Sequence, residues 1–168
     1  TPTPDELIAF QLRMRLRCQP GGASQYSNIG YLVLSRVIEQ VSGMAYEDYI
    51  KQHVLIPAGC YDMHIAGNYY KDRRPNEVKY YGHDPGELIE SFDGSGAMRP
   101  REYGGNNITG LQGAGAWVAS AAELMRLVAS IDGEDGVKDI LSPKSIEQLN
   151  GRNDNDGFGW AYIYSDGY

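Results

Sequence analysis

The sequence predicts a single helix-rich α+β domain spanning residues 1–168. Five segments carry the caps or the apolar spacing of helices, and one segment near the C-terminus alternates in the manner of a β-strand. Between the third and fourth helices, residues 68–113 are rich in Gly, Tyr, Asn and Pro. A chain of 168 residues, of which 42% are hydrophobic, is long enough to bury a sizeable core.

The first helix is predicted to begin after Thr3. Thr3 can cap the helix, Pro4 suits its first position, and Glu6 completes a capping box. The residues from Cys18 to Gly22 have the composition of a turn, so we expect the helix to end before Cys18.

The second helix is predicted to begin at Ser27 or Asn28 and to run to about Val41. Gly43 is well placed to end it. Its apolar residues follow the i, i+3, i+4, i+7 spacing of an amphipathic helix: Leu34, Val37, Ile38 and Val41. A shorter third helix is predicted to end before Pro57, with Tyr46, Tyr49 and Ile50 on one side.

The long segment 68–113 contains one stretch that resembles a strand, residues 78–81. A featureless loop of this length is uncommon inside a compact domain, so we expect either a binding surface or a mixed region. Two tyrosine pairs, Tyr69-Tyr70 and Tyr80-Tyr81, could line a substrate cleft or pack in the core. The sequence leaves these two alternatives open.

Two further helices and a strand are predicted near the C-terminus. Ser120 and Glu123 form a second capping box, and the helix that they open is expected to close at Gly133. Its apolar stripe is Leu124, Leu127, Val128 and Ile131. Pro143 starts a short helix that reaches Leu149. The strand is indicated by alternating aromatic residues, Phe158, Trp160, Tyr162 and Tyr164.

The charge and cysteine content exclude several classes of function. A net charge of −7 argues against nucleic acid as a partner, since a phosphate-binding surface needs clustered Lys and Arg. No apolar run approaches the ~20 residues that span a bilayer. Cys18 and Cys60 are too few for a disulfide framework; they could pair, but buried free thiols are the favoured interpretation.

No metal or cofactor is expected. The histidines lack the spacing of ligands on one helix face, and surface positions are expected for His53 and His64. The acidic residues of the long segment do not match an EF-hand loop, so a solvated face is expected for Asp84, Glu87, Glu90 and Asp93.

The candidate site is the tripeptide from Tyr26 to Asn28 at the start of the second helix. A phenol can carry a proton, and a carboxamide two residues later can hold the polar backbone of a substrate. The alternatives are that Tyr26 packs on Tyr31 or Val33 and that Asn28 caps the helix. Ser27 is expected to be the N-cap rather than a nucleophile, because no general base is adjacent in sequence.

The wider pattern resembles the serine hydrolases related to class C β-lactamases and D-alanyl-D-alanine carboxypeptidases, which include esterases of the penicillin-binding-protein fold. The matching residues are Pro20-Gly21, Tyr26-Ser27-Asn28, Gly30-Tyr31, Ile38-Glu39, Val41-Ser42-Gly43, Tyr46, Tyr49, Ile56-Pro57, Gly115 to Ser120, Glu123-Leu124, Leu141-Ser142-Pro143 and Gly157 to Trp160. The resemblance implies the largely helical part of a β-lactamase or transpeptidase-like fold.

The resemblance also implies a site built from three motifs. The nucleophile belongs to Ser-x-x-Lys, the second motif is Tyr-x-Asn, and the third is Lys-Thr-Gly or His-x-Gly. Tyr26 matches the proton-transfer tyrosine and Asn28 the substrate-orienting asparagine. The expected activity is hydrolysis, through an acyl-enzyme, of an ester, amide or β-lactam in a small molecule or peptide.

Two of the three motifs are missing from this sequence. None of its five lysines has a Ser three residues earlier, and none of its three histidines has a Gly two residues later. We therefore expect the chain to be an excised middle portion of a catalytic domain, inactive by itself. The alternative is a non-catalytic binding or sensor protein on the same fold. The resemblance is compatible with a periplasmic or extracellular location and leaves the oligomeric state open.

Overall fold

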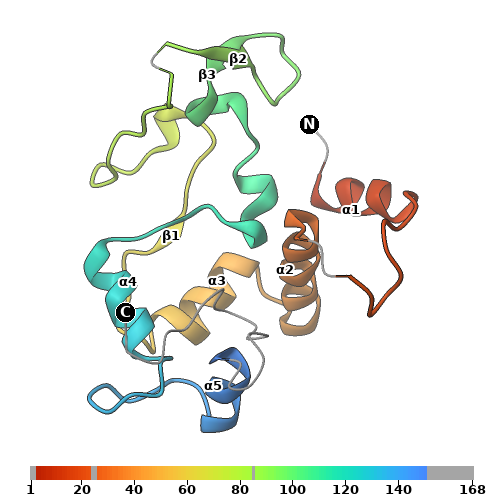
Figure 1. Ribbon diagram of the computed structural model, residues 1–168. Helices are drawn as coiled ribbons and strands as arrows, with labels where there is room; N and C mark the ends of the chain where they lie inside the picture. The colour runs from red at the N-terminus through yellow and green to blue at the C-terminus, as the bar shows by residue number, and fades with distance from the viewer. Residues whose placement is uncertain (1–2, 24–25, 85, 151–168) are drawn as a thin grey trace. The chain divides into compact units, whose positions relative to one another are not determined.

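The computed structural model describes residues 3–23, 26–84 and 86–150, and Figure 1 shows their helices and strands. This part of the chain contains five α-helices and four strands of two or three residues each. The chain divides into two compact units, Thr1–Tyr49 with His64–Val118 and Ile50–Met63 with Ala119–Tyr168. Helices therefore dominate the described residues, as predicted, and the strands form short pairs instead of a broad sheet.

In the first unit, helix α1 (Pro4–Leu12) begins at the predicted cap. The backbone N–H of Glu6 donates to Oγ1 of Thr3 over 3.2 Å, and the Thr3 N–H donates to Oε2 of Glu6 over 2.8 Å. This reciprocal pair satisfies two donors at the helix N-terminus, which confirms the capping box. The guanidinium of Arg36 donates to the Asp5 carboxylate over 3.0 Å and so ties α1 to the next helix.

Helix α2 (Asn28–Ser42) has the predicted boundaries. Ser27 is its N-cap, and Gly43 ends it in the left-handed conformation with φ of 70°. The Gly43 N–H donates to the carbonyl of Glu39 over 2.9 Å, which satisfies one of the last carbonyl groups of the helix.

The buried face of α2 is not the predicted one. Leu32 and Ser35 are fully buried, and the short 3-10 segment η4 (Thr109–Ala114) packs closely against the helix. A Cβ atom on Gly113 would lie 2.4 Å from the carbonyl oxygen of Tyr31, so the absence of a side chain permits this approach. Three members of the predicted apolar stripe are instead exposed: Leu34, Val37 and Val41.

Helix α3 (Tyr46–Ile50) continues as the π-helical turn η1 (Lys51–Leu55) and stops before Pro57, as predicted. Strand β1 (His64–Ile65) pairs antiparallel with β4 (Trp117–Val118). The carboxylate of Glu47 in α3 accepts a 3.1 Å hydrogen bond from the backbone N–H of Ile65. This bond joins α3 to the β1–β4 pair within the first unit.

The long segment 68–113 contains a β-hairpin that the sequence did not indicate. Strand β2 (Leu88–Glu90) pairs antiparallel with β3 (Met98–Pro100), with Ile89 opposite Arg99. The strand expected at residues 78–81 is wrong. The backbone N–H of Tyr80 donates to the hydroxyl of Tyr103 over 2.7 Å instead of to a neighbouring strand.

In the second unit, helix α4 (Ala121–Ala129) begins at Ser120, whose Oγ accepts the Glu123 N–H over 3.2 Å. The predicted capping box forms only in part, because Oε1 of Glu123 accepts the backbone N–H groups of Tyr61 at 2.8 Å and Asp62 at 2.7 Å. Glu123 thereby fixes residues 60–62 to α4. The helix ends at Ala129 and not at the predicted Gly133.

Helix α5 (Pro143–Asn150) confirms the last predicted helix, and its Ile146 is buried. Both cysteines are free: Cys60 is buried and donates from Sγ to the Glu123 carbonyl over 3.1 Å, whereas Cys18 is half-buried. No helix of the described residues has the length and apolar character needed to cross a membrane. The predicted strand over residues 158–164 lies outside the described residues.

Candidate active site

The two predicted site residues are in direct contact at the N-terminus of α2. The hydroxyl of Tyr26 donates to Oδ1 of Asn28 over 2.8 Å. Tyr26 precedes the helix and Asn28 is its first residue, so one local turn sets their separation. The Tyr26 side chain is 78% exposed, which leaves the phenol open to a reacting partner.

The capping arrangement leaves Asn28 available for a ligand. Oγ of Ser27 accepts the Gly30 N–H over 3.3 Å, which confirms Ser27 as the N-cap. The alternative that Asn28 caps α2 is therefore wrong. Among the residues that the structure describes, the Asn28 amide nitrogen has no hydrogen-bond partner, so it can donate to a substrate carbonyl or amide.

Tyr31 packs against the ring of Tyr26, and this contact does not involve the Tyr26 hydroxyl. The two ring centroids lie 6.0 Å apart with an interplanar angle of 42°. The alternative in which Tyr26 packs on Tyr31 thus coexists with the hydrogen bond to Asn28. Within residues 3–23, 26–84 and 86–150, no Lys or Arg is paired with the phenol. A phenol serves as a base near neutrality only when cations favour its charged form.

Glu39, which belongs to the sequence pattern around the site, has a structural role. Its carboxylate forms an ion pair with Arg36 and accepts the backbone N–H of Tyr46 over 2.9 Å. The second contact holds the start of α3 against the last turns of α2. Glu39 therefore stabilises the frame that carries Tyr26 and Asn28.

The Gly-rich turn of the pattern also supports α2. Gly113 lies against Tyr31 and Ser35, and the following Ala116 has a positive φ of 74°. The carbonyl of Ala116 accepts the Ala66 N–H over 2.8 Å, which extends the pairing of β1 with β4. This turn brings η4 to the helix that begins at the candidate site.

A buried polar cluster was missed by the sequence reasoning. His64, expected on the surface, is buried, and its Nε2 lies 3.3 Å from the Glu77 carboxylate. The Tyr80 hydroxyl donates to Glu77 over 2.6 Å, and the Arg74 N–H donates over 3.1 Å. Burial opposes ionisation of Glu77, but these donors hold its pKa below the ordinary value. The sequence gives no local signal for the contact between His64 and Glu77, which are 13 residues apart.

The tyrosine pairs that the sequence left open behave differently from one another. Tyr69 and Tyr70 line a cavity, whereas Tyr80 packs against Tyr103 and Tyr81 is exposed. Within the described chain, no group of three or more His, Cys, Asp or Glu side chains is arranged to hold a metal ion. In the described structure the protonated Tyr26 hydroxyl is a hydrogen-bond donor, and the Asn28 amide nitrogen can donate a second hydrogen bond.

Comparison with known proteins identifies the family to which this chain belongs. The family described as Beta-lactamase matches residues 1–168, and the chain belongs to this family. Penicillin-binding protein 4* of Bacillus subtilis (strain 168) is 26% identical over 150 residues, covering 85% of this chain. The chain spans 32% of that protein and 37% of a second B. subtilis relative, about a third of the length of each.

Two solved structures share the fold. The octameric penicillin-binding protein homologue from Pyrococcus abyssi matches with a TM-score of 0.58 and 27% identity, over 88% of this chain and 30% of its own. D-amino acid amidase from Ochrobactrum anthropi SV3 matches with a TM-score of 0.63 and 19% identity, over 89% of this chain and 39% of its own. The described helices and strand pairs are therefore part of a β-lactamase-like fold.

Proposed function

We propose that this chain is the middle portion of a metal-independent serine hydrolase that forms an acyl-enzyme from an ester, amide or β-lactam. Tyr26 moves the proton and Asn28 orients the substrate. The observation that carries the proposal is the 2.8 Å hydrogen bond between these two side chains on the exposed start of α2. Membership of the Beta-lactamase family supports the reaction class.

In the proposed reaction, a serine hydroxyl attacks the substrate carbonyl while Tyr26 takes the serine proton. Tyr26 then returns that proton to the leaving alcohol or amine as the tetrahedral intermediate collapses. Water subsequently attacks the acyl-serine ester, and Tyr26 relays its proton back to the serine oxygen. The amide nitrogen of Asn28 holds the substrate by a hydrogen bond throughout these steps.

The nucleophile and the activating cations are proposed to come from parts of the protein outside this sequence. No Ser-x-x-Lys occurs in the chain, and the chain spans only about a third of its curated relatives. The exposed apolar side chains of α2 also support this proposal, since a larger fold would cover them. The same neighbours would supply the cation that a working phenolate needs.

Labelling with a fluorophosphonate tests the proposal. We expect the intact protein to take one label on a serine outside residues 1–168 and the isolated chain to take none, as read by mass spectrometry of peptides. A stoichiometric adduct on the isolated chain would contradict the missing nucleophile. An intact protein that takes no label and hydrolyses no activated ester would instead be a non-catalytic binding protein on this fold.

A further inference from the structure

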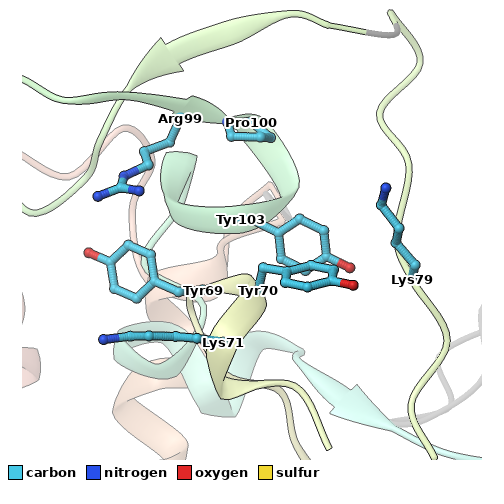
Figure 2. Close-up of a pocket in the computed structure, with 7 residues that line it drawn as sticks. All are labelled: Tyr69, Tyr70, Lys71, Lys79, Arg99, Pro100 and Tyr103. Atoms are coloured by element: carbon cyan, nitrogen blue, oxygen red, sulfur yellow. The ribbon is translucent and has the colours of Figure 1, made fainter. Parts of the chain in front are cut away.

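A cavity of about 610 Å³ lies in the first unit beside the end of β3. Figure 2 shows its lining, which consists mainly of three phenol rings and three cationic side chains: Tyr69, Tyr70, Tyr103, Lys71, Lys79 and Arg99. The volume falls in the range of roughly 300–1,000 Å³ that is typical of small-molecule sites. Among the residues that the structure describes, no carboxylate lines the cavity.

The three cations have no counter-ion within the described residues, although the chain carries a net charge of −7. Their charged groups lie over aromatic rings instead. Lys71 and Arg99 each lie 5.8 Å from the ring centroid of Tyr69, and Lys79 lies 4.9 Å from that of Tyr81. In Figure 2, Arg99 and Lys71 lie above and below the Tyr69 ring. Contact with a ring face leaves a cation free to bind an anion.

The aromatic part of the lining is held by ring packing. Tyr103 is buried. The ring of Tyr70 is nearly perpendicular to it, with the ring centroids 5.1 Å apart, and the ring of Tyr80 stacks on it, with the centroids 5.8 Å apart. Tyr69 stacks on Phe92 at 5.7 Å. The apolar wall of the cavity is thus formed before any ligand arrives, which reduces the entropy lost on binding.

Two carboxylates contact Tyr69: Asp72 accepts its backbone N–H over 3.2 Å, and Asp93 contacts its side chain. The Asp93 carboxylate has two donors. It accepts the Tyr69 hydroxyl over 2.8 Å and the Ser95 N–H over 2.9 Å. These donors, with Ser95 first, hold the pKa of Asp93 far below its usual range. Asp93 therefore remains ionised, and within the described residues it forms no ion pair with a lining cation.

We propose that this cavity binds a small organic anion in which a carboxylate is attached to a flat apolar body. Lys79 on one side of the Tyr70 and Tyr103 rings, and Arg99 with Lys71 on the other, attract the carboxylate. The rings of Tyr70 and Tyr103 contact the apolar body. A nucleic acid would need a longer basic surface than three side chains in an acidic chain provide. The proposal goes beyond the proposed hydrolysis and needs neither Tyr26 nor Asn28.

Calorimetric titration of the intact protein with naphthoate and with the neutral, nearly isosteric naphthamide tests the assignment. Naphthoate should bind more tightly than naphthamide, because only the acid meets the cations. Lys79→Gln and Arg99→Gln should each weaken naphthoate by about 3- to 10-fold, the effect expected for one charge near a protein surface, and leave naphthamide unchanged. Tyr70→Leu should weaken both probes to a similar degree.

Lys138→Gln is the matched control, since Lys138 is an exposed lysine of the second unit. It should leave both affinities as they are. Three results would each overturn the proposal. Naphthoate and naphthamide could bind equally tightly, naphthoate could show no detectable binding, or the affinity for naphthoate could be unchanged in the Lys79→Gln/Arg99→Gln double variant. Inorganic phosphate that binds as tightly as naphthoate would also contradict it, because the apolar body would then contribute nothing.

Discussion

The phenol oxygen of Tyr26 lies 2.8 Å from Oδ1 of Asn28, while Ser27 between them caps α2. Ser27 stabilises the start of the helix. We propose that Tyr26 and Asn28, on either side of it, act as the proton carrier and the hydrogen-bond donor. This division makes the structural and the chemical roles separable by substitution.

Ser27→Ala should therefore affect mainly stability, and Asn28→Ala should affect mainly hydrolysis. Ser27→Ala removes the cap and should lower the free energy of unfolding by about 0.5–2 kcal/mol, with hydrolysis by the folded protein retained. Asn28→Ala should leave stability nearly unchanged and reduce kcat/KM, because the substrate loses a hydrogen bond. Urea unfolding and ester hydrolysis by the intact protein measure the two effects. Equal stability losses in both variants would show that Asn28 is structural.

The packing of η4 on α2 predicts a contrast between two glycines. A Cβ on Gly113 would lie 2.4 Å from the Tyr31 carbonyl, whereas one on Gly30 would find no atom nearer than 3.9 Å. Gly113→Ala should destabilise the protein by about 1–3 kcal/mol through overpacking. Gly30→Ala, inside a helix, should be neutral or stabilising by up to about 1 kcal/mol. Thermal unfolding checks both, and a tolerant Gly113→Ala would contradict the close approach.

Glu123 makes the second unit sensitive to acid. The Asp62 N–H lowers the pKa of Glu123, against the opposing effect of burial, and the Tyr61 N–H lowers it further. Because its folded pKa lies below the ordinary value of 4.5, its contribution to stability is complete above that pH. The contribution is then lost as the pH falls through the lowered folded pKa.

Glu123→Gln should accordingly cost about 1–2 kcal/mol at neutral pH, since a charged acceptor becomes neutral. The difference from the natural protein should shrink as the pH falls below 4.5. Glu134→Gln, at an exposed position, is the control and should show no such trend. Urea unfolding at a series of pH values measures the difference in the free energy of unfolding between Glu123→Gln and the natural protein. A difference that does not change with pH would refute the electrostatic explanation.

The buried cluster of the first unit predicts a contrast between two neighbouring tyrosines. Burial, followed by the hydrogen bond to Glu77, raises the pKa of Tyr80, so its hydroxyl remains a donor to that carboxylate. Tyr80→Phe should destabilise the protein by about 1–3 kcal/mol, because a buried carboxylate loses a donor. Tyr81→Phe, at an exposed ring, should have no effect. Equal unfolding midpoints for the two variants would contradict this role.

Features set by neighbouring residues were predictable from the sequence. The cap at Thr3, the cap at Ser27 and the left-handed Gly43 depend on side chains within four positions, and all three were placed correctly. The predicted apolar stripe of α2 is exposed in this chain. The spacing of Leu34 and Val37 identifies an apolar face but does not show which other segment packs on the helix.

Features set by distant contacts could not be predicted. His64 is buried beside Glu77, and the backbone N–H of Tyr80 donates to the Tyr103 hydroxyl instead of to a neighbouring strand. At the candidate site, the Tyr26 and Asn28 contact follows from a local turn, so the sequence could indicate it. The sequence left open that Tyr69 and Tyr70 line a cleft, and they do line the cavity. Its set of cations could not be foreseen, because these residues come from segments up to 28 residues apart, from Lys71 to Arg99.

Hydrolysis of an activated ester by the intact protein carrying Tyr26→Phe tests the central claim most directly. The substitution keeps the ring that packs on Tyr31 and removes only the hydroxyl, so folding should be preserved. We predict a fall in kcat/KM of about 100- to 10,000-fold, the usual contribution of a proton-transfer group. Tyr31→Phe is the matched control and should retain activity. Unchanged kcat/KM in a folded Tyr26→Phe variant would contradict the assignment of Tyr26.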